Sequence, residues 1–333
     1  MQAHATVSKD GRKQSVGSSF ETRRTRRCDA PQDEVRSEEG NVVPEQNVSF
    51  PSAGLRLSAS VRVPDDVKAG EKRAAFLVLH GFGSNKDSSN VLAPSKVLNE
   101  LGYVTLRFSM RGCGDSEGEF GRVICLEQVE DTRSALTFLA QHPAADRKRI
   151  AVVGSSFGGA VAVYTGGVDE RVAAVISNGG WGDGERKFRG QHKSPEAWAR
   201  FTKMLEEGRA HRAKTGKSLM VPRYDIVPIP PHLRGNLAKN SIEMFPAETA
   251  QSMFDFRADD VVGKIAPRPL LLIHAANDSV TPTEQSIELF KRAGQPAELH
   301  LFSEVDHFLF GEDNARVWGV MRNWLSNYFP AKA

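Results

Sequence analysis

The sequence predicts an α/β protein with an open, mostly parallel central sheet and helices on both faces of that sheet. Short apolar runs such as AAFLVLHG (74–81) and PLLLIHA (269–275) have the length and composition of strands that are buried on both faces. Segments with apolar residues at helical spacing alternate with these runs, for example over 126–142. Such alternation is typical of a parallel sheet, in which ligands bind at the carboxyl ends of the strands.

The core is predicted to begin with a pair of short strands. The stretch NVSFPSAGLRLSASVRVP (47–64) has a turn at Pro51–Gly54 with strand-forming residues on either side. The elements expected after it are a strand over 74–81, a helix over 91–102, a strand over 103–109, a helix over 126–142, a strand over 149–154, a helix over 158–166 and a strand over 172–180.

The alternation stops after residue 180 and resumes near residue 261. The 80 residues 181–260 contain a helical stretch at 194–208 and the proline-rich run VPIPPH at 227–232. They are too many for a plain loop, so we expect a mostly helical cap, without strands, over the carboxyl edge of the sheet. Beyond it the sequence predicts a strand over 269–275, a helix over 282–294, a strand over 297–303 and a closing helix over 314–329.

These predictions divide the chain into three parts. Residues 1–45 are rich in Ser, Arg, Gln and Glu and lack apolar periodicity, so we expect a disordered N-terminal tail. Residues 46–180 and 261–333 form the core, and residues 181–260 form the cap.

Composition excludes several classes of protein. The chain has 333 residues and a net charge of only +3, which argues against a nucleic-acid partner. No apolar run reaches the roughly 18 residues of a membrane span. The three cysteines (Cys28, Cys113 and Cys125) form no CxxC pair, which favours a reducing, cytoplasmic location without a disulfide framework or zinc site. We expect no metal and no cofactor, and the sequence leaves open whether the protein is a monomer or a homodimer.

The stretch VVGSSFGGAV (152–161) contains the candidate nucleophile. Its G-x-S-x-G spacing fits Gly154, Ser156 and Gly158, between a predicted strand and a predicted helix. Small residues on both sides allow a sharp turn that exposes Ser156 at a helix N-terminus. The alternative is a strand–helix turn of small residues without chemistry.

A serine hydroxyl needs a base, and the base needs a group that orients it. Asp278 follows the strand over 269–275, and His307 follows the strand over 297–303, in the order Ser, acid, His expected on this type of sheet. Both loops lie at the sheet edge that carries Ser156. Asp306 is a rival acid, but adjacent side chains usually point apart, which favours Asp278.

An oxyanion hole is expected from HGFGSNKD (80–87), which follows the strand over 74–81. The backbone N–H groups of Phe82 and Phe157 should converge on one oxygen atom. The alternative for this stretch is a flexible turn at the end of a strand.

On these motifs the sequence resembles an α/β-hydrolase over residues 46–180 and 261–333. The stretches that carry the resemblance are LVLHGFGSNKD, RFSMRGCGDSEG, VVGSSFGG, LLLIHAANDSVTP and VDHF. HGFGSNKD and RGCGDSEG are most similar to bacterial esterases of the cinnamoyl-esterase type, and the GSSFGG turn is also similar to hydrolase domains of prolyl-oligopeptidase-like enzymes. The resemblance implies an α/β-hydrolase fold and a cofactor-free serine hydrolase.

The function expected from the sequence is hydrolysis of a small to medium carboxylic ester, aromatic or apolar, through an acyl-enzyme. The same three residues could also cleave an amide, a peptide or a C–C bond, and a non-catalytic ligand-binding protein on this fold is the alternative of another class. Residues 182–223 carry eleven Lys and Arg against five acids, which fits either a solvated helical face or a basic site in the cleft. In the second case one or two basic residues would attract an ester with a free carboxylate, such as a monoalkyl phthalate, and the candidates are Arg186, Lys187, Arg189 and Arg223. The candidate substrate-binding residues are Trp181, Arg186, Arg189, Tyr224 and Phe254.

Overall fold

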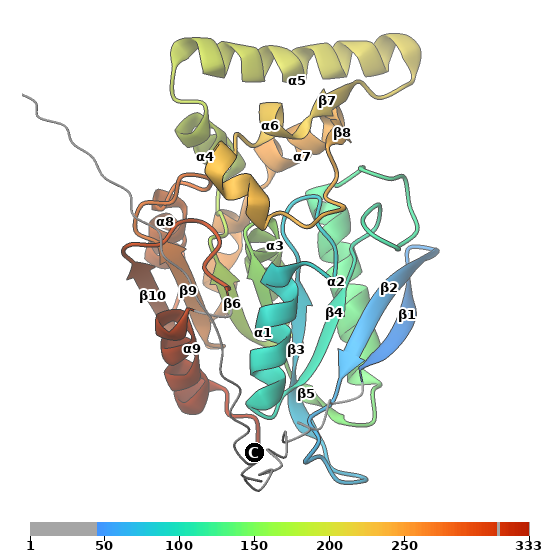
Figure 1. The fold of residues 1–333 in the computed structure, drawn as a ribbon, viewed down its shortest axis with the longest axis vertical. Coiled ribbons are helices and arrows are strands. Elements are labelled where there is room, and N and C mark those ends of the chain that lie inside the picture. Colours follow the sequence, from blue (N-terminus) through green and yellow to red (C-terminus); the bar gives the residue numbers. More distant parts are fainter. Residues whose placement is uncertain (1–44, 312–313, 333) are drawn as a thin grey trace, which may run out of the picture. The chain divides into compact units, whose positions relative to one another are not determined.

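The computed structural model describes residues 45–311 and 314–332 (Figure 1). The tail expected at residues 1–45 lies outside the described residues, apart from Glu45. The Glu45 carboxylate binds the guanidinium of Arg107, with N–O distances of 2.5 and 2.6 Å, directly before the first strand.

An eight-stranded sheet forms the centre of the described structure. Its strand order is β1-β2-β4-β3-β5-β6-β9-β10, in which β2 pairs antiparallel with both β1 and β4 and all other neighbours are parallel. The predicted α/β class and mostly parallel sheet are therefore confirmed. The strands are β1 (Gln46–Ser52), β2 (Leu55–Arg62), β3 (Arg73–Leu79), β4 (Val104–Phe108), β5 (Ala145–Ser155), β6 (Val172–Asn178), β9 (Leu270–Ala275) and β10 (Ala297–Phe302).

Helices cover both faces of this sheet, and the alternation of side chains along β3 shows how. Ala75, Leu77 and Leu79 pack in one apolar cluster with α2 and α3, whereas Phe76 and Val78 pack in a second cluster with α1 and α9. Every residue of β3 and of β9 is buried, as expected for central parallel strands. The helices are α1 (Ser89–Glu100), α2 (Cys125–Ala140), α3 (Phe157–Val168), α8 (Glu284–Arg292) and α9 (Ala315–Tyr328).

The chain between β6 and β9 lies over the carboxyl ends of the central strands (Figure 1). It is mostly helical, as predicted, but the expectation that it lacks strands is wrong. Met220–Pro222 (β7) and Met244–Pro246 (β8) pair antiparallel as a small second sheet. Three-residue strands that end in proline give no alternating pattern in a sequence, which explains why they were not predicted. The helices are α4 (Gly184–Gln191), α5 (Pro195–Thr215), α6 (Arg223–Ile226) and α7 (Ala247–Asp255).

Helix α5 shows how local sequence sets the ends of a cap helix. Ser194 caps its first turn by accepting the N–H of Ala197, and Gly216 ends it in the left-handed conformation, with φ 70°. The helix is longer than the stretch predicted at 194–208. Among the described residues no helix is long and apolar enough to cross a membrane. Cys113 and Cys125 are buried free thiols.

Candidate active site

Ser156 stands at the turn between β5 and α3. Strand β5 ends at Ser155 and helix α3 begins at Phe157, so Ser156 is the residue that links them. Its backbone has φ 55° and ψ −114°, a conformation that costs a non-glycine residue about 1–3 kcal/mol. The turn is strained in the way that a nucleophile elbow requires, and Ser156 lines a pocket above the sheet.

Close backbone contacts explain the glycines on either side of Ser156. A Cβ atom on Gly154 would overlap the carbonyl group of Gly158, and a Cβ atom on Gly158 would lie 2.6 Å from the carbonyl oxygens of Leu79 and His80. Neither position accepts a larger residue without a backbone shift. The G-x-S-x-G spacing therefore has a steric cause, and it places Ser156 at the apex.

Ser155 occupies a different environment, although it also borders the pocket. It is 4% exposed, and its Oγ lies 3.4 Å from the amide nitrogen of the Asn178 side chain. The backbone N–H of Ser156 donates to the carbonyl of Asn178 at 2.7 Å. Asn178, at the end of β6, thus contacts both serines, but no histidine in the described structure contacts the Ser155 hydroxyl.

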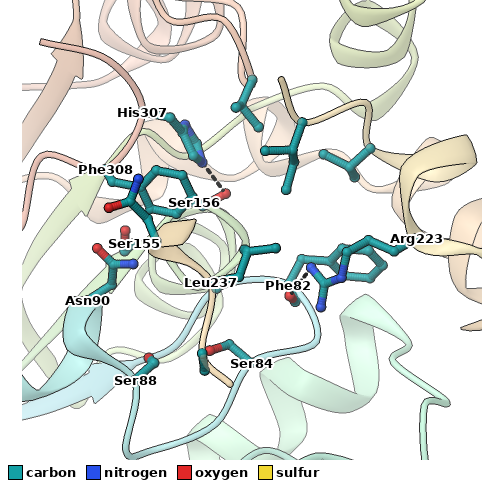
Figure 2. A pocket seen from close by; sticks show the side chains of 16 residues that line it. Phe82, Ser84, Ser88, Asn90, Ser155, Ser156, Arg223, Leu237, His307 and Phe308 are labelled. Carbon is teal, nitrogen blue, oxygen red and sulfur yellow. Dashed lines mark hydrogen bonds between the residues drawn. The ribbon is translucent and has the colours of Figure 1, made fainter. Parts of the chain in front are cut away.

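His307 connects Ser156 to Asp278. The distance from His307 Nε2 to Ser156 Oγ is 2.8 Å, and the distance from His307 Nδ1 to Asp278 Oδ2 is also 2.8 Å (Figure 2 shows the first). A carboxylate only accepts, so Nδ1 carries the proton and Nε2 is free to accept the hydroxyl proton of Ser156. The structure brings together the three residues that the sequence singled out, in an arrangement suited to nucleophilic attack by the serine.

The topology of the sheet explains why these residues meet. Asp278 lies in the loop after β9 and His307 in the loop after β10, and these strands are parallel neighbours. Strand β6 separates β5, which leads to Ser156, from β9. Four parallel strands thus end at one edge, and the loops that follow three of them each supply one side chain.

The carboxylate of Asp278 is completely buried and fully hydrogen-bonded. Its Oδ1 accepts the backbone N–H groups of Val280 (2.8 Å) and Thr281 (2.7 Å), and its Oδ2 lies 3.2 Å from Nε2 of His274. Burial acts to raise the pKa of Asp278, but the positive charge that His307 gains when it is protonated, with hydrogen bonds from His274 and His307, outweighs burial and holds that pKa below its ordinary range. Asp278 is therefore ionised near neutral pH.

Asp306, the rival acid, faces another partner. Its two carboxylate oxygens accept the backbone N–H and the hydroxyl of Ser279, at 2.9 and 2.7 Å, and it also accepts the backbone N–H of His307. It fastens the loop of the acid to the loop of the histidine, while the His307 imidazole binds Asp278.

The loop after β3 lies against the elbow. A Cβ atom on Gly81 would be 3.9 Å from Cβ of Ser156. The N–H of Phe157 belongs to the first turn of α3 and has no intrahelical acceptor, and no acceptor in the described part of the chain takes the N–H of Phe82. Neither amide has an acceptor among the described residues, so both can donate to a substrate oxygen.

Arg223 of the cap braces this loop from the other side. Its guanidinium donates to the carbonyl oxygens of Phe82 (3.0 Å), Gly83 (3.1 Å) and Ile242 (2.7 Å). It lies over the ring of Phe82 (Figure 2) and over the ring of Phe245. Arg223 is 1% exposed, and no carboxylate of the described residues lies within 4 Å of it. Burial lowers the pKa of Arg223 below its ordinary value, but an arginine stays charged in proteins.

The pocket around Ser156 is narrow and mostly apolar. It encloses about 50 Å³, room for a few water molecules. Ser88 is one of its polar residues, and the Oγ of Ser88 is buried without a hydrogen-bond partner. Besides Ser155, Ser156 and His307, the lining consists of Gly81, Phe82, Ser84, Ser88, Asn90, Arg223, Val227, Ile229, Asn236, Leu237, Ala238, Val280 and Phe308.

The five residues that we expected to bind substrate do not line this pocket. Arg186 pairs with Asp259 at 2.8 Å, and Arg189 pairs with Glu185 and lies over the ring of Trp198. Arg186 is thus paired with a residue distant in the chain, whereas Arg189 is paired with a residue four positions earlier in its own helix.

The three aromatic candidates fill other places. Trp181 is 1% exposed and packs against Phe157, with 5.6 Å between the ring centroids. Tyr224 lines a separate cap cavity of about 470 Å³, and Phe254 packs against Trp198.

Sequence reasoning missed most of the pocket wall. Val227 and Ile229 come from the proline-rich run, and Val280 and Phe308 follow Asp278 and His307 closely in the chain. Proximity to the acid and the histidine is a signal that could have identified the last two. In the described part of the chain no group of three His, Cys, Asp or Glu side chains is placed to hold a metal ion.

Comparison with known proteins gives relatives of similar length. An uncharacterized 31.7 kDa protein from the traX-finO intergenic region of Escherichia coli is 26% identical over 288 residues, which are 83% of this chain and 97% of that protein. A protein named thiohydrolase aneE, from Aspergillus aculeatus, is 27% identical over 260 residues, 72% of this chain and 80% of that protein.

Solved structures share the fold. Hypothetical protein PA2218 from Pseudomonas aeruginosa has a TM-score of 0.72 and 24% identity, covering 86% of this chain and 94% of that one. Est1E from Butyrivibrio proteoclasticus, solved with ferulic acid, has a TM-score of 0.61 and 17% identity, covering 84% and 98%. A model of the alpha/beta hydrolase family matches residues 76–320, most of the described chain. The chain therefore belongs to the alpha/beta hydrolase family.

Proposed function

We propose that the protein hydrolyses carboxylic esters through an acyl-enzyme on Ser156. The observation that carries this proposal is the hydrogen-bonded series Ser156–His307–Asp278, with 2.8 Å at both steps, at the wall of a pocket. The elbow, the buried carboxylate and the two free amides supply the other groups that acyl transfer requires. Relatives named as hydrolases and the esterase Est1E support the reaction class.

In the first half of the reaction, Ser156 Oγ attacks the ester carbonyl carbon while His307 Nε2 takes the hydroxyl proton. The carbonyl oxygen becomes an oxyanion, and the N–H groups of Phe82 and Phe157 hold it. Asp278 keeps the imidazole in the correct tautomer and stabilises its charged form. The intermediate collapses, His307 gives its proton to the leaving alcohol, and the acyl group stays on Ser156.

In the second half, water replaces the alcohol. His307 Nε2 takes a proton from the water, whose oxygen attacks the acyl carbon, and the same amides hold the second oxyanion. Collapse releases the carboxylic acid, and the proton on His307 returns to Ser156 Oγ. The ester and water are the only reactants that these steps require.

The pocket also supports a substrate class. Val227, Ile229, Leu237 and Phe308 suit an apolar or aromatic group, in line with the ferulic acid bound by Est1E. Of the basic cap residues considered from the sequence, Arg223 lines the pocket, and two of its five N–H groups remain unused. We infer that an ester with a carboxylate near Arg223 is preferred over its neutral analogue.

A fluorophosphonate probe tests the nucleophile. The wild-type protein and the Ser155→Ala variant should be labelled, whereas Ser156→Ala should not be labelled and should lose nearly all ester turnover. Labelling of Ser156→Ala, or a wild-type protein that is neither labelled nor active on any ester, would contradict the proposal and favour a ligand-binding protein.

Matched substrates test the bond that is cleaved. An oxygen ester, a thioester and an amide with the same acyl group separate esterase, thiohydrolase and amidase activity, and we expect the highest kcat/KM for the oxygen ester. A higher value for the thioester would instead point to the activity in the name of the Aspergillus relative.

A second pair of substrates, alike except for a free carboxylate, tests the role of Arg223. Arg223→Met should lower kcat/KM for both, because Arg223 also braces the loop of Phe82. The informative quantity is the ratio of the two kcat/KM values, which should favour the carboxylated ester in the wild type and approach one in the variant. An unchanged ratio would show that Arg223 only supports the loop.

A further inference from the structure

Lys187 of helix α4 is buried without an acidic partner. It is 1% exposed, and no carboxylate of the described residues lies within 4 Å of its ammonium group. The Nζ atom lies over the ring of Phe188, 4.0 Å from the centroid, and 4.8 Å from the centroid of Trp181. A buried amine in apolar surroundings is unfavourable unless its hydrogen bonds are made, so the contacts of Lys187 call for an explanation.

Lys187 begins a series of hydrogen bonds that ends at the acid of the candidate site. Its Nζ donates to Oε1 of Gln191 at 2.9 Å, and Nε2 of Gln191 donates to the carbonyl of Val280. Protonated Lys187 can only donate and a carbonyl can only accept, so the two contacts fix the orientation of the Gln191 amide. That carbonyl shares its peptide unit with the N–H of Thr281, which donates to Oδ1 of Asp278 at 2.7 Å, and Oδ2 of Asp278 binds His307.

Packing at the end of α4 brings the same two segments together. A Cβ atom on Gly190 would lie 2.6 Å from Cγ of Pro282, so the last turn of the helix sits directly on the loop that follows Asp278. A glycine at this position allows that approach. Because the two segments are this close, the Gln191 side chain can reach the carbonyl of Val280 directly.

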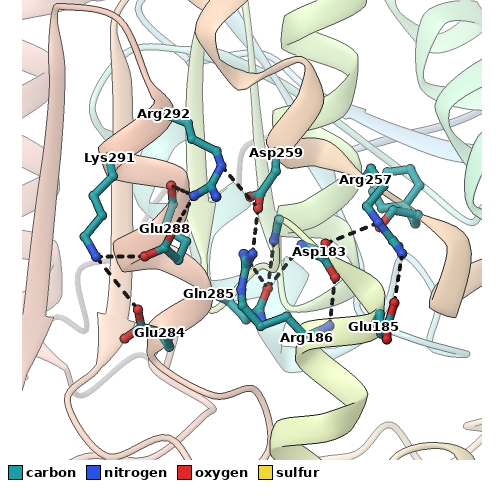
Figure 3. A network of polar contacts seen from close by, with 12 residues as sticks. Asp183, Glu185, Arg186, Arg257, Asp259, Glu284, Gln285, Glu288, Lys291 and Arg292 are labelled. Carbon is teal, nitrogen blue, oxygen red and sulfur yellow. Dashed lines mark hydrogen bonds and ion pairs between the residues drawn. The ribbon is translucent and has the colours of Figure 1, made fainter.

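The first turn of α4 is also held, by the helix that follows this loop. Oε1 of Gln285, in α8, accepts the backbone N–H groups of Gly182 and Asp183 and the guanidinium of Arg186 (Figure 3). Arg186 in turn binds Asp259 at 2.8 Å. Helix α4 is thus in contact with the segment 280–285 at both of its ends, so these contacts couple the position of the acid loop to that of α4.

We propose that Lys187 and Gln191 are positioning residues of the cap that hold the peptide unit between Val280 and Thr281, and through its N–H the Asp278 carboxylate, in line with His307. The inference rests on the proposed function in taking Asp278 as the orienter of the base. It adds that the cap, besides lining the pocket, sets the alignment of the acid. Lys187 and Gln191 touch neither substrate nor Ser156, so they act only through the loop.

The test compares Gln191→Leu, Lys187→Met and the double variant with Lys193→Met, an exposed lysine just beyond α4 that serves as the control. Gln191→Leu keeps the bulk of the side chain but loses the bond to Val280. Its kcat should fall about tenfold, with little change in KM, within the roughly 100-fold that a 1 Å misplacement can cost. The double variant should be no worse than the poorer single variant, because Lys187 acts through Gln191.

A measurement that needs no turnover separates this inference from the proposed function. The proton shared by His307 Nδ1 and Asp278 gives a downfield NMR resonance, which is assigned by its loss in Asp278→Asn. In folded Gln191→Leu this resonance should shift, whereas in Lys193→Met it should not. If this resonance shifts in Gln191→Leu but the wild-type protein hydrolyses no ester, the positioning role is supported and the esterase function is rejected. The positioning role would be wrong if the resonance is unchanged in Gln191→Leu. It would also be wrong if the fold-loss of kcat in the double variant equals the product of the losses in the two single variants.

Discussion

The imidazole of His80 holds the carbonyl group of Gly81, with 2.8 Å between Nδ1 and the oxygen. Its Nε2 accepts the backbone N–H of Met110 at 3.0 Å, so Nδ1 carries the proton. Burial lowers the pKa of His80 to about 4, which keeps the ring neutral and this tautomer in place near neutral pH. The C=O of Gly81 and the N–H of Phe82 belong to one planar trans peptide and point in opposite directions. His80 therefore turns the N–H of Phe82 away from itself and leaves it free for the oxyanion.

His80→Phe should lower activity through the oxyanion hole. Phenylalanine fills a similar volume, but it cannot hold the Gly81 carbonyl or accept the N–H of Met110. We expect kcat to fall about 10- to 100-fold, less than the roughly 10²–10³ lost with an entire oxyanion donor. The buried N–H of Met110 would lose its acceptor, which should lower the unfolding free energy by about 1–3 kcal/mol, whereas the Gly81 carbonyl would keep the N–H of Ser84 at 3.2 Å. Steady-state kinetics and urea unfolding measure both effects, and a folded variant with wild-type kcat would contradict the assignment.

Asp278→Asn and Asp306→Asn should differ strongly. In Asp278→Asn, the amide nitrogen can only donate a hydrogen bond. The groups that now bind the Asp278 carboxylate are also donors, so the contact with this nitrogen is lost. The substitution would also favour the wrong tautomer of His307, so kcat should fall by about 10⁴. Asp306 binds Ser279 and a backbone N–H, so Asp306→Asn should retain most of the activity. The two variants are compared by kcat with the same ester, and equal losses would mean that Asp306 shares the role of the acid.

The stability of the protein should depend on pH through Lys187. Burial lowers its pKa to about 7 from the ordinary 10.5, while Cys125 and Asp278 act in the opposite direction. Between pH 7 and 10.5 the unfolded chain then binds more protons at this residue than the folded chain, so the unfolding free energy rises with pH. Below pH 7 the full cost of the buried charge is present. His192 faces the same ammonium, and burial and the charge of Lys187 lower its pKa.

Lys187→Met removes this dependence. The difference in Tm between the variant and the wild type should favour the variant more near pH 6 than at about pH 9.5, as measured by thermal unfolding in matched buffers. Lys193→Met removes an exposed lysine and should show the same small difference at both pH values. An equal difference for Lys187→Met at the two pH values would mean that Lys187 is not carrying a buried charge. A gain in stability with a loss of kcat is the trade-off expected at functional sites.

The parts of the fold that could be predicted are those with a local signal. The apolar runs that became β3 and β9 are buried at every residue, and burial on both faces is what makes such runs continuous. Ser194 and Gly216 bound helix α5 by local capping, although the predicted stretch ended too early. The pairing of Val221 with Phe245 could not be predicted, because two three-residue strands have no periodicity and meet only through the packing of the cap.

The residues of the candidate site also fall into those with a local sequence signal and those without one. Ser156, Asp278 and His307 could be located because each follows a recognisable strand, and parallel strands bring their carboxyl ends to one edge. Charged cap residues could not be assigned, because the sequence does not show which of them are buried or which contact residues that are distant in the chain. Arg186 pairs with Asp259, Arg223 binds carbonyl groups near residue 82, and Lys187 is buried. A count of basic residues over 182–223 does not distinguish these three outcomes.

Two glycine-to-alanine substitutions should have opposite effects on stability. At Gly158, the new Cβ would lie 2.6 Å from the carbonyl oxygens of Leu79 and His80, so the elbow or strand β3 must move, and both activity and folding should be lost or severely reduced. At Gly319, on the exposed side of α9, no atom lies within 4 Å of the new Cβ. Gly319→Ala should raise the unfolding free energy by about 0.5–1 kcal/mol, because alanine loses less backbone entropy in a helix. Urea unfolding and ester turnover test both variants. An active, fully stable Gly158→Ala would show that the turn at Ser156 can accommodate a Cβ atom despite these close backbone contacts.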